Sequence, residues 1–173
     1  MIKERKTEIF SGRVVSLAIE EHELPDGRRA DFEIVRHPGG AAVLPVLGDG
    51  RVVLINQFRP AAGGMVLEIP AGRLEPGELP EACVRRELQE EVGFRSGHVE
   101  KLGEMFTAVG FCDEVVHLYL GTELEPVPRA PEPDEYIEVL TMPLAEALQR
   151  VRQGQVPDGK TQLALLLYGE REP

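Results

Sequence analysis

Two nearly continuous apolar runs, at residues 41–46 and 52–55, constrain the fold of this chain most strongly. A strand with one face in water alternates apolar and polar residues, whereas a strand covered on both faces is apolar throughout. We therefore predict two central strands covered on both sides, which requires helices packed in layers against the sheet. The intervening Leu47-Gly48-Asp49-Gly50 contains an Asp-Gly pair, so we expect the two strands to pair as a β-hairpin.

Further strands and helices are predicted around this core. Strands fit residues 8–37, around the turn Pro25-Asp26-Gly27, and residues 66–69, 100–107, 115–120 and 136–141, with a Pro- and acid-rich loop at 121–135. Helices fit residues 80–92, 143–153 and 161–168, the first with Pro80 at its start and Gly93 just past its end. Strands interleaved with helices indicate an α/β fold. His37-Pro38-Gly39-Gly40 marks a boundary between N-terminal strands at 1–37 and a main domain at 38–173.

The charge and the cysteine content exclude several classes of protein. The chain has 19 Lys plus Arg against 30 Asp plus Glu, a net charge of −11, which repels nucleic-acid backbones. No apolar run approaches the roughly 18 residues needed to span a membrane, and the N-terminus shows no secretory signal. Cys83 and Cys112 form no paired motif, so we expect reduced thiols and a cytoplasmic protein.

The helix expected at 80–92 carries three acids beside its apolar stripe, not on the face opposite it, where solvent-exposed charges usually lie. Its apolar stripe recurs every fourth residue, at Val84, Leu88 and Val92. Glu87, Glu90 and Glu91 occupy the sector beside that stripe, where they repel one another. Oxygen ligands at this spacing suit a hard cation such as Mg²⁺ or Mn²⁺. Spacing alone leaves open an ordinary acidic helix whose charges are paired by Arg85 and Arg86.

A family resemblance decides between these interpretations. Gly72, Glu78, Arg86-Glu87-Leu88, Glu90-Glu91 and Gly93-Phe94 match the Nudix box at every specified position, and the chain resembles a Nudix hydrolase. The resemblance implies a Nudix α/β/α sandwich with a mixed sheet and an N-terminal β-hairpin extension. It implies divalent cations, Mg²⁺ with Mn²⁺ as a possible substitute, bound by Glu87, Glu90, Glu91 and the Ala71 carbonyl. Arg86 would hold the glutamates through charge-assisted hydrogen bonds.

The segments around the box narrow the resemblance to one group of enzymes. These segments are Gln57-Phe58-Arg59, residues 67–72, Gly110-Phe111-Cys112-Asp113-Glu114 and Asp158-Gly159-Lys160-Thr161, and they are similar to ADP-ribose pyrophosphatases. The C-terminal region also resembles GDP-mannose pyrophosphatases. The implied reaction is hydrolysis of ADP-ribose to AMP and ribose 5-phosphate by a homodimer that the N-terminal strands help to form. Val109 stands where the ADP-ribose enzymes typically carry Pro, which leaves the substrate open.

The resemblance also implies roles outside the box. A catalytic base lies in the loop before the last strand, and we favour Glu135 over Glu132 and Asp134, although a solvated acidic loop is the alternative. Arg59 would bind a substrate phosphate, and Glu68 would contact adenine or a metal; the alternatives are a surface arginine and a strand-face acid. Arg36 would reach substrate across the dimer.

Two other functions stay open at this point. One is a pyrophosphatase for another substrate, such as GDP-mannose, ADP-glucose, FAD or NADH. The other is a non-catalytic Nudix module that senses a nucleotide, although such modules usually lose box glutamates and this chain keeps them.

Overall fold

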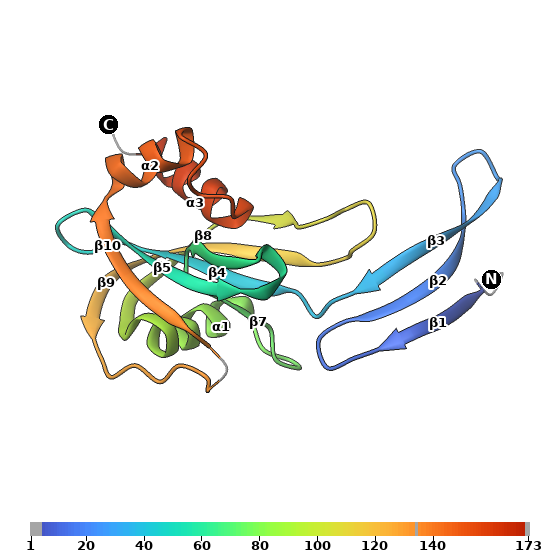
Figure 1. Ribbon diagram of the computed structural model, residues 1–173, viewed down its shortest axis with the longest axis horizontal. Helices are drawn as coiled ribbons and strands as arrows, with labels where there is room; N and C mark the ends of the chain where they lie inside the picture. The colour runs from blue at the N-terminus through green and yellow to red at the C-terminus, as the bar shows by residue number, and fades with distance from the viewer. Residues whose placement is uncertain (1–4, 134, 172–173) are drawn as a thin grey trace. The chain divides into compact units, whose positions relative to one another are not determined.

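A computed structural model describes residues 5–133 and 135–171 of the protein (Figure 1). The described residues form two compact units. The first contains the chain up to Gly39 together with residues 106–115, and the second contains residues 40–105 and the chain from Val116 onward. No local sequence pattern marks residues 106–115 as part of the first unit, because their neighbours there are distant along the chain.

The first unit is a three-stranded antiparallel sheet. It consists of β1 (Lys6–Ser11), β2 (Ser16–Glu23) and β3 (Arg29–Arg36), so the strands predicted at 8–37 are confirmed. The β2–β3 turn contains Gly27 at φ +84°, a conformation that favours glycine. Within this unit, the Val35 amide donates to the Phe111 carbonyl at 2.7 Å, which fastens residues 106–115 to β3.

The second unit contains two sheets. One has the order β7-β4-β9-β8 and the other β10-β5-β6. Their strands are β4 (Gly40–Pro45), β5 (Arg51–Arg59), β6 (Gly64–Glu68), β7 (Ala71–Arg73), β8 (Phe94–Phe106), β9 (Val115–Pro126) and β10 (Ile137–Pro143). Strand β4 runs parallel to β9 and antiparallel to β7, so the first of these sheets is mixed.

The hairpin predicted between residues 41–46 and 52–55 is wrong. Strands β4 and β5 belong to different sheets, and a single bridge between Val46 and Val52 joins the segments beside the turn. Both edges of β4 are already paired, one with β7 and one with β9, which leaves no edge for β5. The prediction that both runs are covered on two faces is confirmed, since β4 and residues 52–55 of β5 are buried throughout.

Helices cover both faces of these sheets. Helix α1 (Pro80–Glu87) continues as one π-helical turn, η2 (Leu88–Val92), while α2 (Leu144–Arg152) and α3 (Gly159–Gly169) end the chain, and a short 3₁₀ turn, η1 (Pro60–Ala62), follows β5. Figure 1 shows α1 on one side of the strands and α2 with α3 on the other. Two apolar clusters result. Val53 and Ile55 of β5 pack in the cluster that contains the box helix, and Val52 and Leu54 pack in the cluster that contains α2 and α3.

The element boundaries agree with the sequence at the box helix and differ at the long strands. Pro80 begins the helix, and Gly93, at φ +72°, follows its last residue. Strand β8 begins at Phe94 rather than at 100, and β9 continues to Pro126, so part of the loop predicted at 121–135 is strand. Prolines indicated a loop, but Pro126 lies at the end of its strand, where a missing N–H is tolerated. No helix in the described residues is long and apolar enough to cross a membrane.

Candidate active site

The box helix turns two of its carboxylates toward the interior of the second unit. Glu87 is 6% exposed and Glu91 is 0% exposed, beside the buried Leu88 and Val92. Glu90 is partly exposed, and Gln89 faces solvent. The helical wheel placed these acids at the border of the apolar stripe, and the structure has them there. Two acids are therefore held in a buried position that a purely solvating role would not require.

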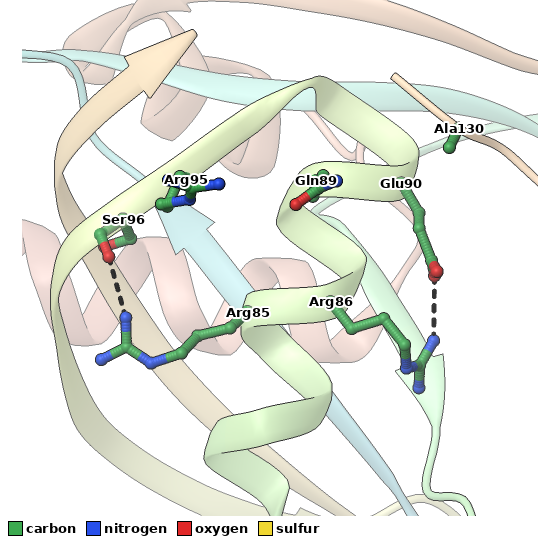
Figure 2. Close-up of a pocket in the computed structure, with 7 residues that line it drawn as sticks. All are labelled: Arg85, Arg86, Gln89, Glu90, Arg95, Ser96 and Ala130. Atoms are coloured by element: carbon green, nitrogen blue, oxygen red, sulfur yellow. Dashed lines mark hydrogen bonds and ion pairs between the residues drawn. The ribbon is translucent and has the colours of Figure 1, made fainter. Parts of the chain in front are cut away.

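Arg86 connects the carboxylates of the box. Its guanidinium donates to both carboxylate oxygens of Glu78 at 3.1 Å, to Glu87 Oε1 at 2.5 Å and to Glu90 Oε2 at 3.0 Å. Figure 2 shows the contact with Glu90. A further bond of 3.2 Å reaches the Arg73 carbonyl. The planar fork of arginine makes these contacts together and so fixes the loop before the helix against the helix itself.

Backbone groups at the start of the box form the other wall of the site. The Ala71 amide donates to Glu91 Oε2 at 3.0 Å. A Cβ on Gly72 would lie 1.6 Å from Glu87 Oε1, so only glycine leaves room for that carboxylate. The sequence thus folds the strand-to-loop segment directly against the two buried acids.

The electrostatics of the two acids follow from their burial. Burial raises the pKa of Glu87 to about 7 against the opposing effect of Arg86, with Glu90 and Glu135 adding to the rise. Burial and the charge of Glu87 raise the pKa of Glu91 to about 9, and Glu135 acts in the same direction. Both shifts show that the ionised carboxylates are destabilised at this position, which a nearby cation would reverse.

These residues fit a hard divalent cation by their chemistry. Carboxylate and carbonyl oxygens are the ligands that such cations prefer. Glu91 Oε1 is buried and has no hydrogen-bond partner among the described residues, so it is an acceptor that lacks a positive partner. No three His, Cys, Asp or Glu side chains in the described part of the chain are grouped as a ready-made metal site. In this arrangement Arg86, in place of a metal ion, neutralises part of the charge of Glu87 and Glu90.

A second set of charges lies where β5, β6 and the start of α3 meet. Arg59 donates to both carboxylate oxygens of Glu68, at 2.8 and 2.9 Å, and Lys160 Nζ donates to Glu68 Oε2 at 2.6 Å. Glu68 is 3% exposed, so its charge is balanced by these two cations. Lys160 also pairs with Asp158 at 3.0 Å. The sequence singled out Arg59 and Glu68 but assigned no role to Lys160, since nothing local connects residues this far apart.

The loop before β10 brings one of its acids toward the box. Glu135 affects the pKa of both Glu87 and Glu91, which places its charge within reach of them. Its Oε2 accepts the Glu132 amide at 3.0 Å, which holds the side chain in the loop. Glu132 is exposed and is not among the main causes of the raised pKa of either buried acid. Asp134 lies outside the described residues.

Arg36 belongs to the first unit and is engaged there. Its guanidinium donates to both oxygens of Glu20 and to Asp113 Oδ2 at 3.0 Å. Glu20 is itself 6% exposed, so Arg36 neutralises a buried acid of its own unit. Val109, in the same unit, is 79% exposed. The loop residue that departs from the ADP-ribose pattern is thus free of packing within its unit.

A groove of about 490 Å³ runs along the outer side of the box helix (Figure 2). It is lined by Arg85, Arg86, Gln89, Glu90, Arg95, Ser96 and Ala130. Arg85 is held there by a 2.8 Å bond to the Ser96 carbonyl. Glu87 and Glu91 do not line the groove, whereas Arg86 and Glu90, which belong to the same cluster, do.

Comparisons with known proteins show what the chain is similar to. Residues 36–163 match the model of the NUDIX domain. The chain is 42% identical to the ADP-ribose pyrophosphatase of Bacillus subtilis (strain 168), over 92% of this chain and 88% of that protein. It is 43% identical to the GDP-mannose pyrophosphatase of Cronobacter sakazakii (strain ATCC BAA-894), over 81% of this chain and 82% of that protein.

A solved structure shares the fold. The crystal structure of an ADP compounds hydrolase superposes with a TM-score of 0.82 at 22% sequence identity, over 98% of this chain and 94% of that chain. The α/β fold class predicted from the sequence is confirmed by this similarity.

Proposed function

The chain belongs to the Nudix family of hydrolases, and from that premise we propose that it hydrolyses the diphosphate bond of a nucleoside diphosphate sugar. ADP-ribose, cut to AMP and ribose 5-phosphate, is the first candidate. The observation that carries the proposal is the buried pair of Glu87 and Glu91 beneath the backbone of Ala71 and Gly72. Relatives with more than four-fifths of their length in common carry the names ADP-ribose pyrophosphatase and GDP-mannose pyrophosphatase.

Mg²⁺ is the proposed cofactor, with Mn²⁺ as a substitute. Glu87, Glu90, Glu91 and the Ala71 carbonyl would hold it. When bound, such a cation neutralises the diphosphate and lowers the pKa of a coordinated water. The unpartnered Oε1 of Glu91 and the raised pKa of both buried acids support a cation at this place.

The chain's own residues have distinct tasks in this reaction. Arg86 orients Glu87 and Glu90 through its bonds to both. Arg59, held by Glu68, binds a phosphate oxygen of the substrate. Glu135 accepts a proton from the attacking water while the water oxygen bonds to phosphorus and the bridging oxygen leaves with the other phosphate. Its charge, which already acts on Glu87 and Glu91, favours Glu135 over Glu132 for this role.

We also propose a division of the chain into a dimerisation element and a catalytic domain. Residues 1–37 serve as a dimerisation element and residues 38–173 as the Nudix hydrolase domain, in a homodimer where Arg36 contributes to the partner's substrate site. Exposed apolar side chains on the N-terminal strands, Ile9, Phe10 and Phe32, support an interface there. Two free cysteines support a cytoplasmic location, and the net charge of −11 argues against a nucleic-acid partner.

A substrate panel tests the function. The purified protein is incubated with Mg²⁺ and ADP-ribose, ADP-glucose, GDP-mannose, FAD or NADH, and the products are separated by ion-exchange chromatography. Fastest turnover of ADP-ribose with release of AMP supports the first candidate. Preference for another compound of the panel supports the alternative that Val109 favours, and preference for GDP-mannose agrees with the name of the Cronobacter relative. Tight binding by isothermal titration without turnover of any compound would instead support a sensor module.

A further inference from the structure

Gln57 on β5 is a buried polar side chain that no contact within the described residues explains. It is 4% exposed, and its Oε1 has no hydrogen-bond partner there. Glu91 Oε1 is the other buried side-chain atom of this kind in the described part of the chain. Burying an acceptor without a donor costs free energy, so each such atom in a folded protein calls for a partner that binds.

The register of β5 determines which way Gln57 points. Strand β5 pairs with β6 and with β10 without a shift in register. Val53 and Ile55 lie in the cluster of the box helix, and side chains two apart share a face of a strand. Gln57 and Arg59 therefore face the box helix as well. The bond from Arg59 to Glu68, the partner of Ile55 across the pair, agrees with this direction.

The elements next to Gln57 carry groups of the proposed site. Ile137, its partner on β10, follows Glu135 by two residues, and the Phe58 amide donates to the Tyr136 carbonyl at 3.1 Å. Strand β5 also contacts η2, the turn that carries Glu90 and Glu91. Gln57 thus lies on the face of β5 toward the box helix, two residues before Arg59 and on a strand that pairs with the segment following Glu135.

Because Gln57 Oε1 is an acceptor, the group that would bind it must be a hydrogen-bond donor, and this limits which bound molecules can be that group. An ionised phosphate has no hydrogen to give, whereas a sugar hydroxyl has one and a water molecule has two, and the loss of analogue affinity measured below separates the sugar from the water. Glu135 is the proposed acceptor of one of the water hydrogens. We propose that Gln57 is a further catalytic residue, whose Oε1 accepts the second hydrogen of the attacking water and so aims the oxygen lone pair at phosphorus. The inference deepens the proposed function and rests on it.

The proton and electron balance is complete with these groups. One hydrogen of the water passes to the Glu135 carboxylate, and the other stays on the oxygen that becomes bonded to phosphorus. The bond from phosphorus to the bridging oxygen breaks, and that oxygen leaves with the second phosphate. Gln57 exchanges no proton, so an amide, which does not titrate, is suited to the position.

The test removes the amide and keeps its size. In Gln57→Leu we expect kcat to fall by about 100-fold, while KM and the affinity for a non-hydrolysable α,β-methylene ADP-ribose, measured by isothermal titration, change less than about threefold. The melting temperature should stay the same or rise, because an unpartnered acceptor has been removed. The matched control is Asn56→Leu, the same change on the opposite face of β5, which should leave kcat unchanged.

Several results would overturn the inference. These are a kcat of Gln57→Leu within about threefold of wild type, a loss of analogue affinity that accounts for the whole effect, or an equal loss of kcat in Asn56→Leu. If Gln57→Leu fails to fold, Gln57→Met gives the same comparison. If wild type turns over substrate and the Gln57 variant does so equally fast, the proposed function stands but Gln57 has no role in catalysis. If wild type turns over no compound of the panel, both the proposed function and the role of Gln57 are contradicted.

Discussion

Gly72 lies against the carboxylate of Glu87 so closely that a Cβ at this position would be 1.6 Å from Glu87 Oε1. Strand β7 and a buried acid of the box helix therefore compete for the same space. Because the contact is with a side chain that Arg86 also holds, Glu87 cannot turn away without losing that bond.

Gly72→Ala should lower both stability and turnover. We expect the free energy of unfolding to fall by about 2 kcal/mol, as for other insertions into packed sites, and kcat to fall at least tenfold. Urea denaturation and steady-state kinetics measure the two effects. Gly48→Ala is the control, since nothing lies within 4 Å of a Cβ there. Equal behaviour of the two variants would contradict the contact.

Glu91→Gln should separate catalysis from stability. The amide keeps an oxygen for the Ala71 N–H and cannot ionise, whereas Glu91, with its pKa raised to about 9 by burial, must take up a proton to be buried beside Glu87 without a metal. We expect turnover to fall at least about 100-fold, and the metal-free protein in EDTA to gain about 1 kcal/mol of stability. Added Mg²⁺ should raise the melting temperature of wild type and not of the variant. Glu81→Gln, an exposed acid on the same helix, should change neither quantity; a near-normal rate in Glu91→Gln would contradict the ligand role.

Arg86→Lys tests the connecting role of the guanidinium. An ammonium group keeps the charge but cannot reach Glu78, Glu87 and Glu90 in one planar arrangement. The expected loss is about 2 kcal/mol of stability and about tenfold in kcat/KM. Arg85→Lys, the neighbouring change at a more exposed position, should cost much less. Equal losses would mean that the geometry of Arg86 is unimportant.

The Glu68 cluster should make stability depend on acid pH. Burial acts to raise the pKa of Glu68, but the hydrogen bonds and charges of Arg59 and Lys160 outweigh it and hold the pKa below its usual value of 4.5. A carboxyl with a depressed pKa stabilises the fold fully above its unfolded value and loses that contribution as pH falls through the folded value. Stability should therefore decline below pH 4.5.

Glu68→Gln isolates that contribution. The variant should lose about 2 kcal/mol near neutral pH, because two cations lose their charged partner, and its stability should vary less below pH 4.5 than that of wild type. Urea midpoints measured from neutral to acidic pH give the comparison. The same acid slope in both proteins would show that other carboxyls cause the decline.

Some of this site could be read from local spacing. The sequence predicts the helix over residues 80–92 with both of its ends, because Pro80 restricts the backbone at its start and Gly93 permits the left-handed residue just past its end. The position of Glu87 and Glu91 at the border of the apolar stripe also followed, since helical periodicity is a local property.

Local sequence patterns were sufficient to predict the box helix, the burial of the strands at 41–46 and 52–55, and the family. Tertiary structure alone decided that β4 and β5 enter different sheets, that Lys160 meets Glu68, and that Gln57 faces the box helix. The reason is physical: propensity and periodicity act between residues a few positions apart, whereas a strand's partner and an ion pair's partner are chosen among surfaces that only the folded chain brings together.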